Sequence, residues 1–368
     1  MQKVLHISGA KGWGGNEQQL IDLVQEFKSP NIENIVLGVG GSILEKKCKM
    51  NDILFIPVKT NKLNKFVNYK YIKQITKDLK PDIIHLHTSD SLTAFVISDL
   101  LYKIKIPSVF SKKGMGRSSS FLSKFKYNYK NLSAIICVSE KVKREFSEIL
   151  SEKNRKKLIV IYDGISILRM KSANHLLLHQ IGLQDTKFKL INIGNHVRAK
   201  DLPTLIQMMN ILVNDLGEKQ VQLVQIGEFK DEITDKLQQM IDRFQLNNHV
   251  KLTGFIEDAS SYLSQFDIFV MSSEREGLPL TIYEAFYKKV PVVSTKAGGI
   301  PEVISDDKNG LLVEIGDYKN MALKINQLLH NEDKQQSFCD AGYELFINNY
   351  SARQCALNTK NLYKSLLK

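Results

Sequence analysis

The segment 272–285 combines three carboxylates, of which Glu276 and Glu284 matter here, with a proline and a helical pattern. It reads SSEREGLPLTIYEA and follows a strand predicted at 268–271. Pro279 fits the first turn of a helix, since its missing N–H would have no partner there in any case. We therefore predict a strand, a loop and then a helix that continues through Tyr287.

This arrangement places Glu276 in the loop and Glu284 inside the helix. The free N–H groups of Leu280 and Thr281 at the helix start can bind an anion such as a diphosphate. A carboxylate on each side can accept hydrogen bonds from hydroxyls, so the pattern predicts a ligand with sugars flanking a diphosphate. Taken singly, Glu276 could instead stabilise the helix dipole, and Glu284 could be a solvated helix residue.

Two cations occupy a second loop, GNHVRAKD at 194–201, after a strand predicted at 189–193. Arg198 and Lys200 would lie at the carboxyl end of that strand. Cations there can neutralise the negative charge that builds up on a departing diphosphate. Two cations in a loop are also common on protein surfaces.

The first half contributes a glycine-rich loop and two histidines. The loop GAKGWGGNEQQL at 9–20 allows close backbone approach to a ligand, but it lacks the GxGxxG spacing of dinucleotide sites. His85 and His87 end a predicted strand and share one of its faces. A metal site formed by these two histidines is one alternative, although no Asp, Glu or Cys lies near them in the sequence at a spacing that would chelate a metal ion. We favour one histidine facing the ligand and one packed or exposed.

Short apolar runs alternate with amphipathic helical stretches along the chain. The predicted strands are 4–7, 34–39, 53–58, 83–87, 108–111, 134–138 and 158–162, then 189–193, 221–226, 250–252, 268–271, 291–294 and 310–314. This alternation indicates βαβ units and parallel sheets. Because the pattern pauses over 167–186, we predict two doubly wound α/β domains with a ligand cleft where they face each other.

Composition narrows the function classes. The chain has 368 residues, 43% of them hydrophobic, and no run that approaches a membrane span or a signal peptide, which predicts a globular cytoplasmic protein. Its net charge of +12 is uneven, because 1–170 hold 29 Lys and Arg against 15 Asp and Glu and the remainder hold 22 against 24. The four cysteines form no CxxC pair, so we expect reduced packing residues.

These residues together resemble the family-4 retaining glycosyltransferases, which have the GT-B fold of two Rossmann-like domains. Glu276 and Glu284 resemble that family's E-x7-E motif, here EGLPLTIYE. Further matches are PVVSTKAGGIPEVI at 291–304, NGLLVEIGD after it, IYDGI at 161–165, DIIHLH at 82–87 and GGNEQQL at 14–20. The family often has Gly-Arg where this chain has Gly194-Asn195, and Arg198 could substitute one turn away.

The resemblance implies a role for each site residue. Glu276 would contact the hydroxyls of the donor sugar, Glu284 the ribose, Lys200 and a nearby arginine the diphosphate, and His87 the sugar and acceptor side. The further donor-binding residues that it suggests are Gly14, Gly15, Asn195, Arg198, Gly277, Leu278, Leu280 and Thr281. We expect no cofactor and no metal ion, because the sequence has no DxD motif and the cations can act in place of a divalent ion.

The resemblance also sets domain limits. We predict an N-terminal Rossmann-like domain on the acceptor side at 1–167, a linker at 168–186 and a C-terminal nucleotide-sugar-binding domain at 187–348. A C-terminal helix within 349–368, with Ser351 as its N-cap and Ala352, Ala356, Leu362, Tyr363 and Leu366 on its apolar face, would cross back to the first domain.

The predicted activity is transfer of a sugar from a nucleotide diphosphate donor with retention of configuration, in bacterial surface polysaccharide synthesis. A UDP-sugar is favoured over GDP-mannose as the donor, and the acceptor would be a saccharide or a lipid-linked saccharide. Two alternatives stay open: a GT-B sugar-nucleotide epimerase, and a non-enzymatic nucleic-acid-binding protein. The second is disfavoured, so nucleic acid is not an expected partner, because no nucleic-acid module is present and the E-x7-E segment would have no role.

The segment 111–130, SKKGMGRSSSFLSKFKYNYK, holds six basic residues and no acidic one. If 119–132 is helical, Phe121, Leu122 and Phe125 lie on one face, which predicts an amphipathic helix at an anionic membrane surface. An ordinary helix with its aromatics in the core is the alternative. We expect the protein to be peripheral on the inner face of the cytoplasmic membrane.

Overall fold

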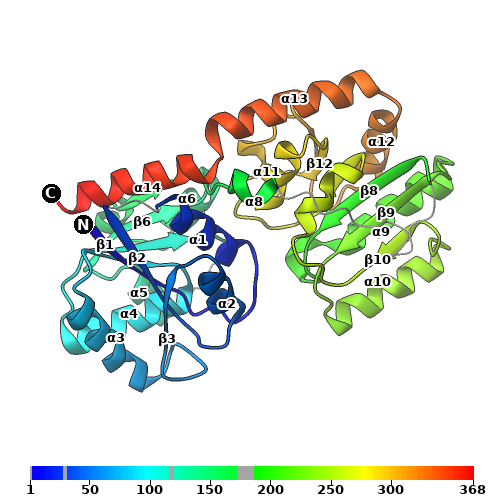
Figure 1. The fold of residues 1–368 in the computed structure, drawn as a ribbon. Helices are drawn as coiled ribbons and strands as arrows, with labels where there is room; N and C mark the ends of the chain where they lie inside the picture. Colours follow the sequence, from blue (N-terminus) through cyan, green and yellow to red (C-terminus); the bar gives the residue numbers. More distant parts are fainter. Residues whose placement is uncertain (1, 28–30, 116–119, 172–185) are drawn as a thin grey trace. The chain divides into compact units, whose positions relative to one another are not determined.

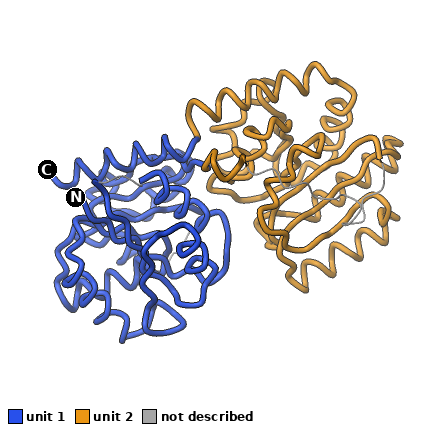
Figure 2. The backbone as a smooth tube through the Cα atoms, in the orientation of Figure 1, with its two compact units in different colours: residues 1–165, 351–368 blue, residues 166–350 orange. Residues whose placement is uncertain are grey.

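The computed structural model describes residues 2–27, 31–115, 120–171 and 186–368. The chain divides into two compact units (Figure 2). Unit 1 contains residues 1–165 and 351–368, and unit 2 contains residues 166–350. The doubly wound α/β architecture expected from the sequence is confirmed in each unit.

Unit 1 is built on a parallel seven-stranded sheet with the strand order β3-β2-β1-β4-β5-β6-β7 (Figure 1). Its strands are β1 (Gln2–Ile7), β2 (Ile32–Gly38), β3 (Leu54–Pro57), β4 (Ile83–Leu86), β5 (Ser108–Lys112), β6 (Leu132–Cys137) and β7 (Leu158–Val160). Its helices are α1 (Gly15–Glu26), α2 (Ile43–Met50), α3 (Phe66–Leu79), α4 (Ser89–Tyr102), α5 (Phe121–Tyr127), α6 (Glu140–Ser147), α7 (Glu152–Arg155) and α14 (Ala352–Leu366).

Unit 2 is built on a parallel six-stranded sheet with the strand order β10-β9-β8-β11-β12-β13. Its strands are β8 (Phe188–Ile193), β9 (Val221–Ile226), β10 (Val250–Leu252), β11 (Ile268–Met271), β12 (Val292–Thr295) and β13 (Leu311–Val313). Its helical segments are α8 (Ile167–Met170), η2 (Arg198–Lys200), α9 (Leu202–Asn210), η3 (Ile211–Asp215), α10 (Asp231–Arg243), η4 (Ala259–Gln265), α11 (Leu280–Tyr287), η5 (Ile300–Glu302), α12 (Tyr318–Leu329) and α13 (Glu332–Asn349).

The predicted strands all form, and the central ones are covered on both faces, whereas the strands β3, β7 and β10 at sheet edges are partly exposed. Every residue of β4, β9, β11 and β12 is buried, as expected for parallel strands between two helical layers. The order of each sheet reverses between its first strand and its fourth, at β1 and β4 in unit 1 and at β8 and β11 in unit 2. Ligands of such sheets bind outside the carboxyl ends of the strands at this switch point.

The C-terminal helix α14 completes the core of unit 1. Ser351 caps it by accepting a hydrogen bond from the Gln354 N–H. Tyr363 is fully buried, and its ring lies 5.8 Å from that of Phe27 in α1. The other predicted apolar residues also face the core, with Leu366 packed against its edge.

The first boundary between the units differs from the predicted one. Unit 1 ends at Ile165 rather than at residue 167, and 168–170, predicted as linker, form part of helix α8 in unit 2. Met170 is buried there, which fixes the helix by burial of its apolar side chain. Residues 172–185 of the predicted linker lie outside the described residues.

Helix α5 is shorter than predicted. It starts at Phe121 and ends at Tyr127, whereas Leu132 already belongs to β6 and pairs with Ser108 of β5. The side-chain N–H of Asn128 donates to Lys124 O and Ile149 O, so this residue ends the helix and ties it to the following loop. Residues 116–119 lie outside the described residues.

The four cysteines are free and buried, in agreement with a packing role. Burial raises the pKa of Cys48, Cys137 and Cys355 to about 12, so these thiols stay protonated at neutral pH. Within the described part of the chain, no helix is long and apolar enough to cross a membrane.

Candidate active site

Lys200 and Glu276 meet at the switch point of unit 2. Lys200 ends η2 after β8, and Glu276 lies in the loop after β11. Glu276 Oε1 accepts hydrogen bonds from Lys200 Nζ and from Ser273 Oγ, both at 2.7 Å. The side chains of Lys200 and Glu276 are 22% and 13% exposed. A cation and a carboxylate are thus held together at the edge of the sheet where a ligand is expected.

Backbone contacts fix the two loops that carry this pair. The Glu274 N–H donates to Ala199 O at 2.9 Å, and Ser272 Oγ donates to Lys200 O at 3.0 Å. Thr295 of β12 donates from its hydroxyl to Ser273 O at 2.6 Å. The position of the ion pair therefore follows from the adjacency of β8, β11 and β12.

Gly298 allows a third loop to lie against Glu276. It has φ +55°, a left-handed conformation that favours glycine, and a Cβ there would stand 1.7 Å from Glu276 O. The neighbouring Gly299 N–H donates to Gly277 O at 3.1 Å. The sequence KAGGIPE therefore holds the Glu276 loop in place.

The other residues of the 194–201 loop have different surroundings. Asn195 Oδ1 accepts from the Glu228 N–H at 2.9 Å, so this side chain ties the loop to the one after β9. The Arg198 side chain is 89% exposed, and its Nε lies 3.7 Å from Glu274 Oε1. In this structure Arg198 therefore contacts Glu274, whereas Lys200 contacts Glu276.

Helix α11 begins one residue later than predicted, because Pro279 is its extended N-cap residue rather than part of its first turn, and Leu280 and Thr281 are its first two residues. Proline has no side-chain acceptor, so the N–H groups of the first turn have no side-chain cap. Leu278 and Leu280 are buried beside this helix start. The helix N-terminus thus follows directly on the loop that carries Glu276.

Glu284 is buried in α11 and paired with Arg169 of α8. Its side chain is 8% exposed, and its Oε1 accepts from Arg169 NH2 at 2.8 Å. Arg169 NH1 also donates to Ser260 Oγ at 3.3 Å. The alternative of a solvated helix residue is therefore wrong for Glu284, because an ion pair holds it inside unit 2.

Three histidines gather at the switch point of unit 1. His6 of β1 lies opposite His85 of β4, and His87 follows on the same face. All three are buried, and their ligand atoms lie within 4.8 Å of one another. His85 Nδ1 and Nε2 hydrogen-bond to Tyr363 and Ser111 at 2.6 and 2.8 Å. Of the two histidines that end the predicted strand, His85 is thus the packed one, and neither His85 nor His87 is exposed.

Burial keeps these three rings neutral. Desolvation lowers the pKa of His6 to about 4 and the pKa values of His85 and His87 well below the ordinary value. Neutral imidazoles can ligate a metal ion, but both ring nitrogens of His6 and of His85 already have hydrogen-bond partners. The arrangement fits a hydrogen-bonded cluster better than a three-histidine metal site.

Gly14 and Gly15 lie at the start of α1, after β1. Glu17 follows in the first helical turn and is 9% exposed, and its burial raises its pKa to about 7. Nearby, Lys113 forms an ion pair with Asp163 of the IYDGI segment and donates to Gln19 Oε1 at 3.1 Å. The glycine loop is thus bordered by polar groups of unit 1.

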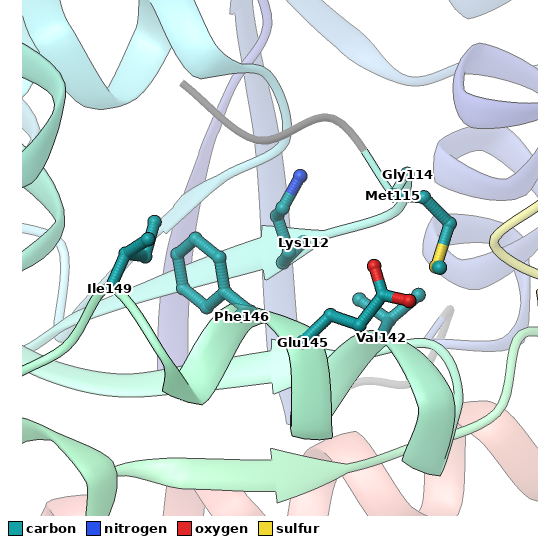
Figure 3. A pocket seen from close by; sticks show the side chains of 7 residues that line it. All are labelled: Lys112, Gly114, Met115, Val142, Glu145, Phe146 and Ile149. Atoms are coloured by element: carbon teal, nitrogen blue, oxygen red, sulfur yellow. The ribbon is translucent and has the colours of Figure 1, made fainter. Parts of the chain in front are cut away.

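A small pocket in unit 1 lies between the end of β5 and helix α6 (Figure 3). Val142, Phe146 and Ile149 line its apolar side, and the chain of Lys112 passes beside the Phe146 ring. None of the site residues predicted from the sequence lines it.

The structure thus brings together Lys200 and Glu276 in unit 2, and it places His87, Gly14 and Gly15 in unit 1. Sequence reasoning missed Ser273, Gly298, Arg169 and the partners of His87. The GG of KAGGIPE was a signal for Gly298. Arg169 had no local signal, because its partner lies 115 residues away.

Each unit has the parallel Rossmann-like sheet that is found in GT-B glycosyltransferase structures. The solved structure of Anabaena HepE in complex with UDP-glucose superposes with a TM-score of 0.87 at 20% identity, covering 99% of this chain and all of that one. The fold is therefore GT-B.

Sequence comparison then gives the family. Residues 13–169 match the model of glycosyltransferase family 4, and residues 176–345 match that of glycosyl transferases group 1. The chain belongs to the family-4 type glycosyltransferases, which confirms the resemblance inferred from its motifs.

Curated relatives span most of the chain. An uncharacterized glycosyltransferase of Methanocaldococcus jannaschii is 28% identical over 81% of this chain and 79% of its own length. The N-acetyl-alpha-D-glucosaminyl L-malate synthase of Bacillus anthracis is 22% identical over 78% and 75%. The capsular polysaccharide biosynthesis glycosyltransferase CapM of Staphylococcus aureus is 26% identical over 64% and 62%.

Proposed function

We propose that this glycosyltransferase moves a sugar from a UDP-sugar to a saccharide or lipid-linked acceptor, with retention of configuration, in bacterial surface glycan synthesis. The observation that carries the proposal is the Lys200–Glu276 pair at the switch point of unit 2. HepE, which shares the fold, was solved with UDP-glucose. CapM supports a polysaccharide product.

The proposed roles follow from charge and position. The Lys200 ammonium neutralises the diphosphate, Glu276 accepts hydrogen bonds from donor-sugar hydroxyls, and the N–H groups of Leu280 and Thr281 face the phosphates. Glu284 accepts from the ribose while Arg169 holds its carboxylate in place. Arg198 has few contacts and can move toward the same diphosphate.

We propose a front-face reaction. The bond between the anomeric carbon and the diphosphate oxygen breaks, and the acceptor oxygen bonds to the same face of that carbon. The leaving phosphate oxygen takes the acceptor proton, so no additional carboxylate nucleophile is required. Lys200 stabilises the charge that develops on the leaving group.

A thermal-shift panel of nucleotide sugars tests the donor. A UDP-sugar at 100 times its dissociation constant should stabilise the chain by about 2.7 kcal/mol, which corresponds to a rise in Tm of roughly 5–10 °C for units of this size. A larger shift with GDP-mannose, or no shift with any nucleotide sugar, would contradict the UDP assignment.

Product analysis separates transfer from epimerisation. Incubation with donor alone should leave the sugar nucleotide unepimerised, and the glycoside formed with acceptor should keep the anomeric configuration of the donor. An epimerised donor in the absence of acceptor would favour the epimerase alternative.

We also propose that helix α5 contacts an anionic membrane surface, where a lipid-linked acceptor would be met. Phe121 and Leu122 are 82% and 77% exposed, and Lys124 of the same helix and Lys130 after it are exposed as well. Lys126 is not available for this role, since its Nζ donates to Ser89 and Thr93 of α4. Apolar insertion and basic attraction together give reversible, salt-sensitive binding.

Liposome co-sedimentation tests this contact. The chain should bind anionic but not zwitterionic vesicles, and binding should drop when Phe121 and Leu122 become Ser or when Lys124 and Lys130 become Glu. The matched control reverses the charge of two other exposed lysines, Lys153 of α7 and Lys156 at its C-cap, and should retain binding. Absence of binding at low salt would rule the contact out.

A further inference from the structure

The hydrogen bonds around His6 determine which nitrogen of His87 carries a hydrogen. His6 Nε2 lies 3.2 Å from Asn34 Oδ1, and His6 Nδ1 lies 3.0 Å from His87 Nε2. An amide oxygen can only accept, so His6 Nε2 must be the protonated nitrogen. A neutral imidazole has a single N–H, so His6 Nδ1 accepts and His87 Nε2 donates to it.

The same reasoning leaves His87 Nδ1 without a hydrogen. This atom is buried, and among the described residues it has no hydrogen-bond partner. An unpaired acceptor in the interior is uncommon, because burial removes water and nothing replaces its hydrogen bond. The other ring nitrogens of the cluster all have partners. The open lone pair is therefore specific to His87.

The fold determines how Asn34, His6 and His87 are arranged. Three neighbouring strands supply these side chains, with Asn34 in β2, His6 in β1 and His87 directly after β4. The order of the strands in the sheet therefore places His6 between Asn34 and His87. Burial keeps each ring neutral, because desolvation lowers the pKa of both His6 and His87. A charged His6 would donate from both nitrogens and would reverse the hydrogen bond to His87.

We infer that Asn34 and His6 are positioning residues that hold His87 as the Nε2–H tautomer, so that its bare Nδ1 accepts a hydrogen bond from a substrate hydroxyl. This inference rests on the proposed function, and it takes from the family resemblance the expectation that His87 contacts the sugar. It assigns a direction to that contact: the ligand group must donate a hydrogen.

The direction of this hydrogen bond determines which ligand groups His87 can bind. A sugar hydroxyl can donate to Nδ1, whereas a carboxylate or a phosphate oxygen at the same place would direct a lone pair against a lone pair. The site is therefore suited to a neutral, hydroxyl-bearing sugar, and a uronic acid with its carboxylate at this contact would be rejected.

Nitrogen-15 NMR of the histidine rings tests the tautomer in the full chain without any substrate, because protonated and bare ring nitrogens have distinct shifts. In the wild type, His87 should show a hydrogen on Nε2 and none on Nδ1. His6→Leu removes the acceptor and should leave His87 as a mixture of tautomers. His6→Asn retains an acceptor on the same side-chain position as Nδ1 and should restore the wild-type tautomer.

Kinetics then connect the tautomer to transfer. His6→Leu should lower kcat/KM for transfer by about tenfold to a hundredfold, the scale of losing one buried, oriented hydrogen bond. His6→Asn should recover most of this loss, and the affinity for UDP should stay unchanged in both. Thermal unfolding of both variants controls for folding.

Four results would overturn the inference. They are a hydrogen on His87 Nδ1 in the wild type, an unchanged tautomer in His6→Leu, failure of His6→Asn to restore either readout, and stoichiometric Zn²⁺ shifting all three rings together, which would indicate a metal site. The NMR outcome stands even if the chain transfers no sugar from any donor, so failure of the proposed function is seen separately.

Discussion

Glu276→Gln is expected to lower the turnover number by about 10²–10³, the scale of losing one well-placed transition-state contact. The substitution keeps the shape of the side chain and its acceptor oxygen but removes the negative charge. Without that charge the side chain binds sugar hydroxyls more weakly and no longer balances Lys200 at 2.7 Å. Steady-state kinetics with a saturating donor measure the effect.

The contrast with Glu284→Ala makes this test specific. Glu284 is proposed to hold the ribose, so its loss should chiefly raise the donor KM. A matched control is Glu314→Gln, because Glu314 pairs with Lys296 at the exposed surface of unit 2 and should leave both constants unchanged. Wild-type turnover in Glu276→Gln together with a wild-type donor KM in Glu284→Ala would contradict the assignment of both residues to the donor site.

Lys200→Ala is the second substitution with a large expected effect, and we expect turnover to fall by at least about a hundredfold. The departing diphosphate would lose its cation, and the Glu276 carboxylate would be left to repel it. Transfer assays combined with thermal unfolding should show lost activity in a folded chain.

Lys200→Met separates charge from packing. The stem of Lys200 lies over Gly194, where an added Cβ would be 3.2 Å from it, so alanine removes some packing as well as the charge. Methionine keeps an apolar stem, and it should be as inactive as alanine. An active Lys200→Met variant would contradict the role of the Lys200 charge. The control is Lys219→Ala, which removes a lysine elsewhere on unit 2 and should leave the enzyme active.

Arg198→Ala shows whether the loop needs a second cation. A loss comparable to that of Lys200→Ala would place Arg198 on the diphosphate in the working enzyme, although its side chain contacts Glu274 here. Full activity would show that Lys200 is sufficient.

The strands and loops could be predicted from the sequence because their signals are local. Continuous apolar runs identify parallel strands, and Pro279 marks the start of α11 within a few residues of Glu276. The chemistry of the E-x7-E segment is therefore readable from one stretch of chain.

The partners of these residues could not be predicted in the same way. From the sequence alone, Glu284 could be a solvated helix residue, because its partner Arg169 lies in α8, far away along the chain. His87 meets His6 only because β4 pairs with β1, 81 residues apart in sequence. The end of α5 is likewise set by the pairing of Leu132 with β5, which outweighs the helical pattern beyond Tyr127.

The contribution of α14 to unit 1 has a consequence for biosynthesis. Unit 2 is one continuous stretch, so all of its residues are available before residues 351–368 leave the ribosome. Unit 1 lacks Tyr363, which packs on Phe27 and hydrogen-bonds His85, until those last residues emerge. Because domains fold as units, unit 1 can complete its core only after the whole of unit 2 has been synthesised.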